Sequence, residues 1–402
     1  MTTKREASDV VLAAVTGTNG KTSVVEFHRQ ILATAGMRSA SLGSLGLTVT
    51  GWGRETMPRI GDDESAMPRF VAALGEEGVD ALAFEAFSAA LASGIHDGLR
   101  VDAAGWTNLS YEHLEGHGTL DDYFAAKLRL FTELLSDDGT AVVNFDDPAA
   151  AQVLAVCERR GVEVVTYGSD GDIRARATRA GGGLDVDLRI FDSEVSCRVP
   201  LFAAFELANA LCSLGLALAA GVSPSVAVDA MSRLVPPPGR MVNVGERDGA
   251  LVVVDYAHNP GGLTAALDAL RQETPGRLVL VFGCGGDRDP AKRTLMGEVA
   301  ARSADVVIVT DDNPRGEDPQ QIRAKIIETC PRAREVPDRA EAIQAAVAMA
   351  RPGDTVLIAG KGDEASIEVE GRHLPHCDVD VARRELEALQ RSRGLGAPSR
   401  ES

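Results

Sequence analysis

Residues 16–23 read TGTNGKTS, and this stretch follows directly on the apolar run Val10–Val15 and precedes an amphipathic run. Glycines let backbone N–H groups approach a phosphate closely, and the start of a following helix adds the positive end of its dipole. Lys21 is expected to reach the terminal phosphates, and Thr22 can ligate Mg²⁺. The predicted phosphate-binding residues are therefore Gly17, Thr18, Asn19, Gly20, Lys21, Thr22 and Ser23.

This stretch departs from the standard phosphate-loop spacing at one position. Val15 stands where the pattern GxxxxGK[ST] has its first glycine. A generic Gly-rich turn is the alternative interpretation. The apolar strand, the loop, the Lys-Thr pair and the helical pattern all agree with a phosphate loop, so we favour that interpretation.

Outward from this loop, short apolar runs alternate with helical patterns. Such alternation is typical of an α/β fold with mainly parallel sheets, whose strands are covered by helices on both faces. The expected strands are Val10–Val15, Ala81–Phe84, Thr140–Asn144, Val162–Tyr167, Leu251–Asp255, Arg277–Phe282, Asp305–Thr310 and Thr355–Ala359.

Two segments break this alternation. Residues 172–200 alternate polar and apolar side chains without a helical pattern, which predicts an antiparallel hairpin region. The run Val235-Pro236-Pro237-Pro238-Gly239 follows a helical stretch, and three prolines cannot continue a helix. We therefore expect a first domain over residues 1–235 and a second over residues 236–402.

Composition narrows the class of protein. The chain has 402 residues, 25% of them charged, and a formal net charge of −18. This charge disfavours a nucleic acid or an anionic membrane as partner, because both attract basic surfaces. The polar start MTTKREASDV lacks the apolar core of a signal peptide, and six scattered cysteines form no CxxC pair. We expect a cytoplasmic protein with no membrane span.

The TGTNGKT loop resembles that of the Mur ligases, and the resemblance runs from about Val10 to Glu387. It is closest to the type that adds the third residue of the peptidoglycan stem peptide. The stretches that carry it are TNLSYEHLEGHGTLDDYFAAKLRLF, VVVDYAHNPGGL, VFGCGGDRDPAKRTLMG, VTDDNPR and AGKGDE. The resemblance implies a P-loop ATPase-type domain, a Rossmann-like C-terminal domain, and the cofactors ATP and Mg²⁺.

The resemblance also implies a set of metal-site residues. Glu85 follows the strand in AFEAFS, and its family counterpart ligates Mg²⁺; the alternative is a solvated carboxylate at a strand end. His113 in TNLSYEHL matches a second metal-site residue. Lys127 matches a lysine that is carbamylated in these ligases and holds a second Mg²⁺, although a plain surface lysine is the alternative. A lysine adds CO₂ only when neutral, which requires a desolvated site.

Four further residues resemble nucleotide contacts of the family. Arg240, in the GRM stretch after the prolines, resembles an arginine that contacts ATP phosphate. Asp255 and His258 end a strand of the second domain and match residues at the ribose and base. Asn209, in the helical LANAL stretch, resembles an asparagine near the adenine. Each residue alone has an ordinary structural alternative. The four together are stronger evidence for nucleotide binding than any one of them.

Charged side chains follow three expected strands of the second domain. Loops at the ends of parallel strands converge on one crevice, where paired arginines can bind a carboxylate and a glutamate can hold a distant ammonium. That is a pocket for an amino acid with a second charged end. In the family, DNPR marks enzymes that use meso-diaminopimelate, although Asp363 stands here for the histidine of GKGHE. The predicted amine-side residues are Arg288, Asp312, Asn313, Arg315, Gly360 and Glu364.

The acceptor side departs most from the family. Only about ten residues precede the loop, so we expect the uridine-binding N-terminal domain to be missing. The family's acceptor-binding TTP stretch is Thr56-Met57-Pro58 in this chain. The family's EVSSHGL is EAFSAAL here, so Ser88 is all that remains of its Ser-Ser-His group. We therefore expect a ligase that acts through an acyl phosphate and joins a smaller, non-muramyl acid of secondary metabolism to diaminopimelate or a similar amino acid.

Three alternatives stay open at this point. One is a peptidoglycan precursor ligase that adds diaminopimelate to UDP-MurNAc-dipeptide and uses a separate acceptor-binding protein as partner. A folylpolyglutamate or poly-γ-glutamate type of ligase shares the loop, but the DNPR and GCGGDRD segments speak against it. A non-catalytic nucleotide-binding regulator would not need the metal-site residues.

Overall fold

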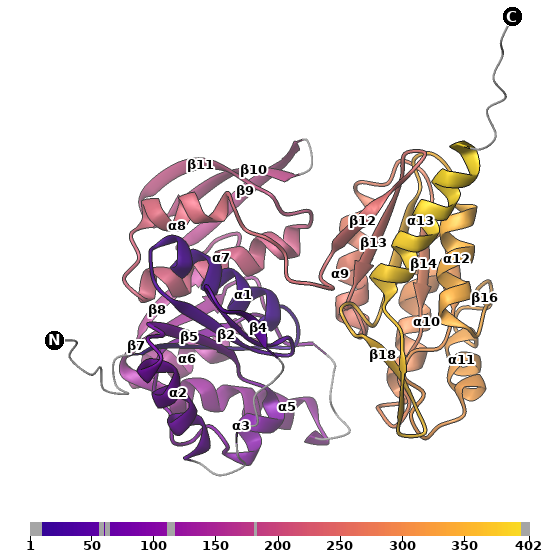
Figure 1. Ribbon diagram of the computed structural model, residues 1–402. Coiled ribbons are helices and arrows are strands. Elements are labelled where there is room, and N and C mark those ends of the chain that lie inside the picture. Colours follow the sequence, from indigo (N-terminus) through magenta and orange to yellow (C-terminus); the bar gives the residue numbers. More distant parts are fainter. Residues whose placement is uncertain (1–9, 56–59, 61–64, 111–116, 181–182, 395–402) are drawn as a thin grey trace, which may run out of the picture. The chain divides into compact units, whose positions relative to one another are not determined.

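The structure is a computed structural model that describes residues 10–55, 60, 65–110, 117–180 and 183–394 (Figure 1). The chain divides into two compact units, Met1–Pro237 and Pro238–Ser402. The division falls inside the run of three prolines, where a helix cannot continue. Among the described residues, no helix is long and apolar enough to cross a membrane.

The first unit is built on a large mixed sheet whose central strands are parallel. Its strands β8, β7, β6, β1, β5 and β2 pair in parallel, and antiparallel strands extend both edges. Within the described residues the order is β11 (Ser193–Val199), β10 (Gly183–Ile190), β9 (Ile173–Ala180), β8 (Glu163–Tyr167), β7 (Leu135–Asn144), β6 (Val101–Trp106), β1 (Val11–Thr16), β5 (Ala81–Glu85), β2 (Ser39–Gly43), β3 (Gly46–Val49) and β4 (Gly53–Glu55).

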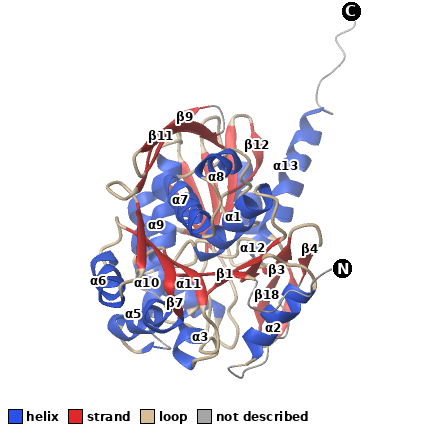
Figure 2. Ribbon diagram, turned by 90° about the vertical axis from the view of Figure 1, so that its left-hand side faces the viewer, coloured by secondary structure: helices blue, strands red, loops and turns tan. Residues whose placement is uncertain are grey.

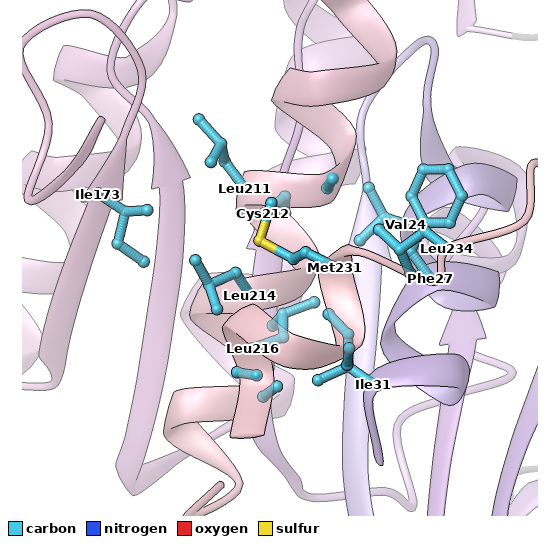
Figure 3. Packing of buried hydrophobic residues seen from close by; sticks show 14 of the residues in the cluster. Val24, Phe27, Ile31, Ile173, Leu211, Cys212, Leu214, Leu216, Met231 and Leu234 are labelled. Carbon is cyan, nitrogen blue, oxygen red and sulfur yellow. The ribbon is translucent and has the colours of Figure 1, made fainter. Parts of the chain in front are cut away.

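Helices cover both faces of this sheet because successive side chains of each strand point to opposite faces. Ala13 and Val15 of β1 pack in one core with α1 (Lys21–Thr34), α7 (Ala204–Ala219) and α8 (Pro224–Met231). Figure 3 shows Phe27 and Ile31 of α1 beside Met231 of α8 and the leucines of α7 in this core. Leu12 and Ala14 belong to a second core under α2 (Ala66–Glu76), α3 (Ser88–Ser93), α5 (Leu120–Arg129), the π-helix η2 (Leu130–Leu134) and α6 (Ala150–Arg160).

The hairpin region predicted for residues 172–200 is confirmed. β9, β10 and β11 pair antiparallel, and Figure 1 shows them side by side. Along β10, Val186 and Leu188 are buried whereas Asp185 and Asp187 are exposed. One face of this ribbon therefore packs on the core, and the other faces solvent.

The second unit is a smaller parallel sheet with helices around it; Figure 2 colours the helices and strands of both units. β13, β17, β14, β15 and β16 pair in parallel, and β12 joins β13 antiparallel. Among the described residues its strands are β12 (Val242–Arg247), β13 (Ala250–Asp255), β17 (Thr355–Ala359), β14 (Leu278–Phe282), β15 (Val306–Val309) and β16 (Arg334–Glu335), with the hairpin β18 (Ser366–Val369) and β19 (Arg372–Pro375). Its helices are α9 (Pro260–Arg271), α10 (Ala291–Ser303), α11 (Pro319–Ile327), α12 (Arg339–Met349) and α13 (Asp378–Gly394).

The expected α/β class is confirmed, and each of the eight predicted strands is present with bounds shifted by a few residues. The largest shift is at β7, which starts at Leu135 rather than Thr140. In both units the chemically distinctive side chains follow the carboxyl ends of parallel strands. These ends meet at one edge of a sheet, which is the usual place for a ligand in open α/β folds.

Candidate functional site

The predicted phosphate loop connects β1 to α1, as the sequence indicated. Gly17 and Gly20 adopt φ values of 142° and 90°, which favour glycine. A Cβ at Gly20 would lie 2.3 Å from Oδ1 of Asn209 on α7, so the amide of Asn209 packs directly against the loop. The glycine conformations and the start of α1 together form a cradle that suits a phosphate group.

The loop is braced from the end of the neighbouring strand β6. The backbone N–H of Asn19 donates to Oδ1 of Asn108 at 3.0 Å, and Nδ2 of Asn108 donates back to the Asn19 carbonyl at 3.1 Å. The Thr107 hydroxyl donates to the same carbonyl at 2.6 Å. These two residues lie in the TNLS stretch, and we did not single them out from the sequence.

Lys21 begins α1 and its side chain folds back over the loop. Its Nζ donates to the carbonyl oxygens of Gly17, at 2.9 Å, and Thr18, at 2.8 Å. The same Nζ lies 5.9 Å from the ring centroid of Phe87. The ammonium therefore already sits at the loop, where a bound phosphate would offer it a charged partner.

The candidate Mg²⁺ ligands Thr22 and Glu85 lie next to each other. The Thr22 hydroxyl donates to Oε1 of Glu85 at 3.0 Å, and the backbone N–H of Ser44 donates to the same oxygen at 2.8 Å. Both side chains are buried. A hydroxyl and a carboxylate are hard oxygen ligands, so this pair fits a Mg²⁺ ion that also binds phosphate oxygens.

The remaining predicted metal ligands differ in what can be said of them. His113 lies outside the described residues, as does Thr56 of the predicted acceptor site. Among the residues that the structure describes, no group of three or more His, Cys, Asp or Glu side chains is arranged to hold a metal ion. A metal ion bound by Thr22 and Glu85 would therefore need further ligands, such as phosphate oxygens and water.

Lys127 on α5 lies against the phosphate loop rather than on the surface. Its side chain is only 1% exposed, and its Nζ donates to the Gly17 carbonyl at 2.8 Å. The Nζ also lies 4.3 Å from the ring centroid of Tyr123, whose hydroxyl is 3.5 Å from the Thr18 hydroxyl. The alternative of a plain surface lysine is therefore wrong.

The acceptor-side residue Ser88 is paired with a histidine that the sequence did not single out. Ser88 begins α3, just after Glu85, and its hydroxyl lies 3.0 Å from Nε2 of His117. The His117 ring lies 5.3 Å from the ring of Tyr123. A continuous set of side chains thus runs from Lys127 at the loop to Ser88. The second histidine of the HLEGHG stretch was the only signal for it.

In the second unit, the predicted nucleotide contacts gather at the end of β13. The guanidinium of Arg240 lies 3.9 Å over the Tyr256 ring, and that ring is 4.5 Å from the ring of His258. The carboxylate of Asp255 accepts the backbone N–H groups of Met241 and Ala257, each at 2.8 Å. Burial raises the pKa of Asp255, although Arg240 and the two N–H groups oppose that rise.

The predicted amine-side residues meet at the ends of β15 and β17 around a lysine that we had not selected. Nζ of the fully buried Lys361 donates to Oδ1 of Asn313 at 2.8 Å and to Oε2 of Glu364 at 2.6 Å. Nδ2 of Asn313 donates to the same Glu364 oxygen at 2.9 Å. Lys361 thus links two residues that the sequence predicted separately, and it stands inside the quoted AGKGDE stretch.

The other amine-side residues lie around this network. Nε of Arg315 donates to Oε2 of Glu368 at 3.1 Å, and its Nη1 donates to the Gly286 carbonyl at 2.8 Å. Asp312 is buried beside Gly360, since a Cβ at Gly360 would lie 2.8 Å from its Oδ2. Arg288 is exposed, and no hydrogen bond or ion pair joins it to this network within the described part of the chain.

Two family models match the chain, one in each unit. Residues 15–217 match the Mur ligase middle domain, and residues 239–362 match the glutamate ligase domain of Mur ligases. Similar proteins include UDP-N-acetylmuramoyl-L-alanyl-D-glutamate–2,6-diaminopimelate ligases. The one from Rhizobium meliloti is 43% identical over 384 residues, which are 94% of this chain and 78% of that protein. The one from Bradyrhizobium diazoefficiens is 44% identical and covers 93% of this chain and 78% of its own length.

Solved structures show the same likeness. A structure of a UDP-N-acetylmuramoyl-L-alanyl-D-glutamate–2,6-diaminopimelate ligase is 33% identical, with a TM-score of 0.67, and covers 95% of this chain and 79% of its own. Mycobacterium tuberculosis folylpolyglutamate synthase complexed with ADP and AMPPCP has a TM-score of 0.73 at 20% identity, covering 88% of this chain and 89% of its own. At that identity the second likeness concerns the fold alone.

These comparisons bear on the acceptor that the sequence led us to expect. The relatives at 43% and 44% identity and the structure at 33% identity are named for UDP-N-acetylmuramoyl-L-alanyl-D-glutamate, which favours the alternative of a peptidoglycan precursor ligase over a small acid of secondary metabolism. With a family model in each unit and relatives of this identity over most of its length, the chain belongs to the Mur ligase family of ATP-dependent ligases, which use ATP and Mg²⁺.

Proposed function

We propose that this chain joins 2,6-diaminopimelate to UDP-N-acetylmuramoyl-L-alanyl-D-glutamate and consumes ATP in doing so. The relatives at 43% and 44% identity carry the name of this reaction. The observation on which the proposal depends most is the network of Asn313, Lys361 and Glu364, because it provides an acidic group at the position predicted to hold an ammonium. A peptidoglycan precursor ligase was among the alternatives that the sequence left open.

On the nucleotide side, the first unit supplies the groups that phosphoryl transfer needs. Lys21 and the loop N–H groups would bind the terminal phosphates, while Thr22 and Glu85 would hold Mg²⁺. Mg²⁺ and these cations neutralise charge on the phosphoryl group that is transferred, and such positioning accounts for most of the catalysis in this chemistry. ATP would transfer its γ-phosphoryl group to the acceptor carboxylate and leave as ADP. The amine would then attack the acyl carbon and displace phosphate, which forms the amide.

Lys127 is placed where its charge state matters. In the structure its ammonium donates a hydrogen bond to the Gly17 carbonyl oxygen in the loop. A carbamylated Lys127 would instead present an oxygen anion beside the loop, of the kind that ligates Mg²⁺. Its burial next to Tyr123 provides the desolvated site that carbamylation requires, because burial favours a neutral amine. We keep carbamylation as part of the proposal.

On the amine side, the second unit provides groups of both signs. Lys361 and Asn313 both donate to Oε2 of Glu364, which leaves Oε1 available for a substrate ammonium. The Glu364 side chain is 34% exposed, so part of this side chain faces solvent. Arg315 and Arg288 would bind a substrate carboxylate through paired N–H donors. Diaminopimelate has an ammonium and a carboxylate at each end, and so fits such a set.

The test is a reconstitution with purified full-length protein. It is supplied with ATP, Mg²⁺, diaminopimelate and UDP-N-acetylmuramoyl-L-alanyl-D-glutamate, while ADP release is measured and the product mass is determined. We expect ADP and the tripeptide product in equal amounts, with neither formed when any one substrate is omitted. L-Lysine, which lacks the second carboxylate, is the matched control and should support a much lower rate.

Two results would count against the proposal. Equal rates with lysine and diaminopimelate would remove the assigned role of the arginines. Turnover on small carboxylic acids, combined with none on the UDP-muramoyl dipeptide, would return the acceptor to the class that we first expected.

A further inference from the structure

A buried ion pair lies behind the amine-side network. Arg339 begins α12 and Asp378 begins α13, and both side chains are fully buried, at 0% exposure. Nε and Nη2 of Arg339 donate to the two oxygens of Asp378, each at 2.7 Å. Nε2 of His376 lies 2.8 Å from Oδ1 of the same carboxylate. The guanidinium is thus held in one orientation by a two-pronged contact.

The remaining donors of Arg339 reach the two loops that carry the amine-side residues. Its Nη2 also donates to the Ala359 carbonyl at 2.8 Å, at the end of β17 and just before Gly360. Its Nη1 donates to the Asp311 carbonyl at 3.2 Å and lies 4.0 Å from Oδ2 of Asp312, in the loop after β15. One planar group therefore spans the loop that leads to Asn313 and the loop that leads to Lys361 and Glu364.

A contribution to stability alone does not account for this arrangement well. A buried ion pair loses the hydration of both ions, and apolar residues of similar size are often as stabilising or more so. A cation is also unfavourable at the start of a helix, where Arg339 lies. Burial alone would raise the pKa of Asp378, but the Arg339 charge outweighs it and holds that pKa well below its usual range. The pair is therefore ionised, and its donors are directed at backbone carbonyls.

We propose that Arg339, oriented by Asp378 and His376, is a positioning residue that sets the spacing of the two amine-binding loops and thereby the affinity for diaminopimelate. The inference rests on the proposed function, since it concerns the pocket of that reaction. Arg339 does not contact the substrate groups itself. It acts through the Ala359 and Asp311 carbonyls, and the close approach of Asp312 to Gly360 transmits its position to the loops.

The decisive variant removes both charges at once. In Arg339→Met/Asp378→Leu neither charge of the pair is buried without the other, so folding is expected to persist, although Asp312 loses the cation 4.0 Å from its Oδ2 and the two carbonyls lose their donor. We expect the KM for diaminopimelate to rise by about tenfold or more, as for other buried hydrogen bonds that lose one partner, while the KM for ATP changes by less than about twofold. The matched control is Lys325→Met/Glu328→Leu, an exposed ion pair on α11, which should leave both constants unchanged.

A second pair of variants separates positioning from stability. His376→Ala removes one group that orients Asp378, whereas His376→Gln retains an N–H donor at that place. If positioning is the role, the alanine variant should raise the KM for diaminopimelate by about threefold, as expected for one hydrogen bond, and the glutamine variant should restore it. Thermal melting of each variant shows whether the fold is intact.

The outcomes distinguish this inference from the proposed function. If the wild-type protein does not ligate diaminopimelate at all, the proposed function fails. If the wild-type protein does so but the folded Arg339→Met/Asp378→Leu variant keeps its KM for diaminopimelate, or raises both KM values equally, the positioning role is wrong. A rise confined to diaminopimelate, with rescue by His376→Gln, supports it.

Discussion

Two lysines show how differently the two candidate sites are built. Lys21 in the first unit donates to main-chain carbonyls three and four residues before it. Lys361 in the second unit is fully buried and bonds to side chains, one of them 48 residues away in the sequence. The phosphate site is thus made by a contiguous stretch of backbone, whereas the amine site is made by side chains that only the fold brings together. The first depends on local sequence, and the second depends on the spacing of loops.

The largest effect is expected at the contiguous site. In Lys21→Ala the loop should keep its backbone shape, because the bonds that brace it from Thr107 and Asn108 do not involve the Lys21 side chain. The transferred phosphoryl group loses one of its charge partners, so ADP release should fall by about 1,000-fold. Lys325→Ala, an exposed lysine in the other unit, is the control and should be unaffected. Retention of more than a tenth of the wild-type rate by Lys21→Ala would place the phosphate site elsewhere.

Glu85→Gln tests whether the neighbouring carboxylate acts through metal. Glutamine keeps the size of the side chain and can still accept from Thr22 and Ser44, but it ligates Mg²⁺ far more weakly. We expect a fall of about 100-fold in the rate, together with a shift of the Mg²⁺ dependence to higher concentration. ADP release measured over a series of Mg²⁺ concentrations checks both. If the midpoint of the Mg²⁺ dependence stays at its wild-type value, Glu85 is not a metal ligand. Glu158→Gln, on the exposed face of α6, is the control variant and should leave the rate and the Mg²⁺ dependence unchanged.

The site made by side chains should respond with a different kinetic signature. Lys361→Met keeps the length of the side chain but leaves Glu364 and Asn313 without their shared donor. Loss of one partner from a buried charged hydrogen bond should raise the KM for diaminopimelate by about 30-fold or more. The KM for ATP should stay within a factor of about two, because Lys361 donates to Asn313 and Glu364, which are both predicted amine-side residues. Steady-state kinetics with each substrate varied in turn would show an equal rise in both constants if Lys361 served only stability.

These differences also explain what the sequence could predict. The phosphate loop, the strands and the segments at their ends follow from contiguous patterns, and the structure agrees with them. The same patterns located Asn313 and Glu364 in two separate loops, but nothing in the sequence paired either with Lys361. His117 beside Ser88 and Arg339 beside Asp378 were missed for the same reason. Hydrogen bonds between residues 29 and 39 positions apart depend on the final packing, so no local pattern predicts them.

The two units also differ in how acid should affect them. In the first unit His96 is 8% exposed beside the Phe84 ring, and neither of its ring nitrogens has a hydrogen-bond partner among the described residues. Burial lowers its pKa from 6.5 to about 4, with partial opposition from Asp97. Between those pH values His96 is protonated in the unfolded chain and neutral in the folded one. The free energy of unfolding therefore falls as the pH falls from about 6.5 to 4. In the second unit burial would raise the pKa of Asp378, but Arg339 holds it well below its ordinary value. The stability that this shift contributes is present above the ordinary pKa of 3.8 and is lost as the pH falls below that value.

His96→Leu should therefore flatten the pH dependence of the first unit. By pH 4 the histidine costs up to about 3 kcal/mol of unfolding free energy, and a leucine of similar volume removes that cost. His28, whose pKa burial also lowers to about 4, remains, so only part of the slope should disappear. Both tryptophans, Trp52 and Trp106, lie in the first unit, so their fluorescence during denaturant unfolding at pH 7 and pH 5 reports on that unit alone. The exposed His373→Leu is the control, and an unchanged slope in His96→Leu would mean that His96 is protonated in the folded protein.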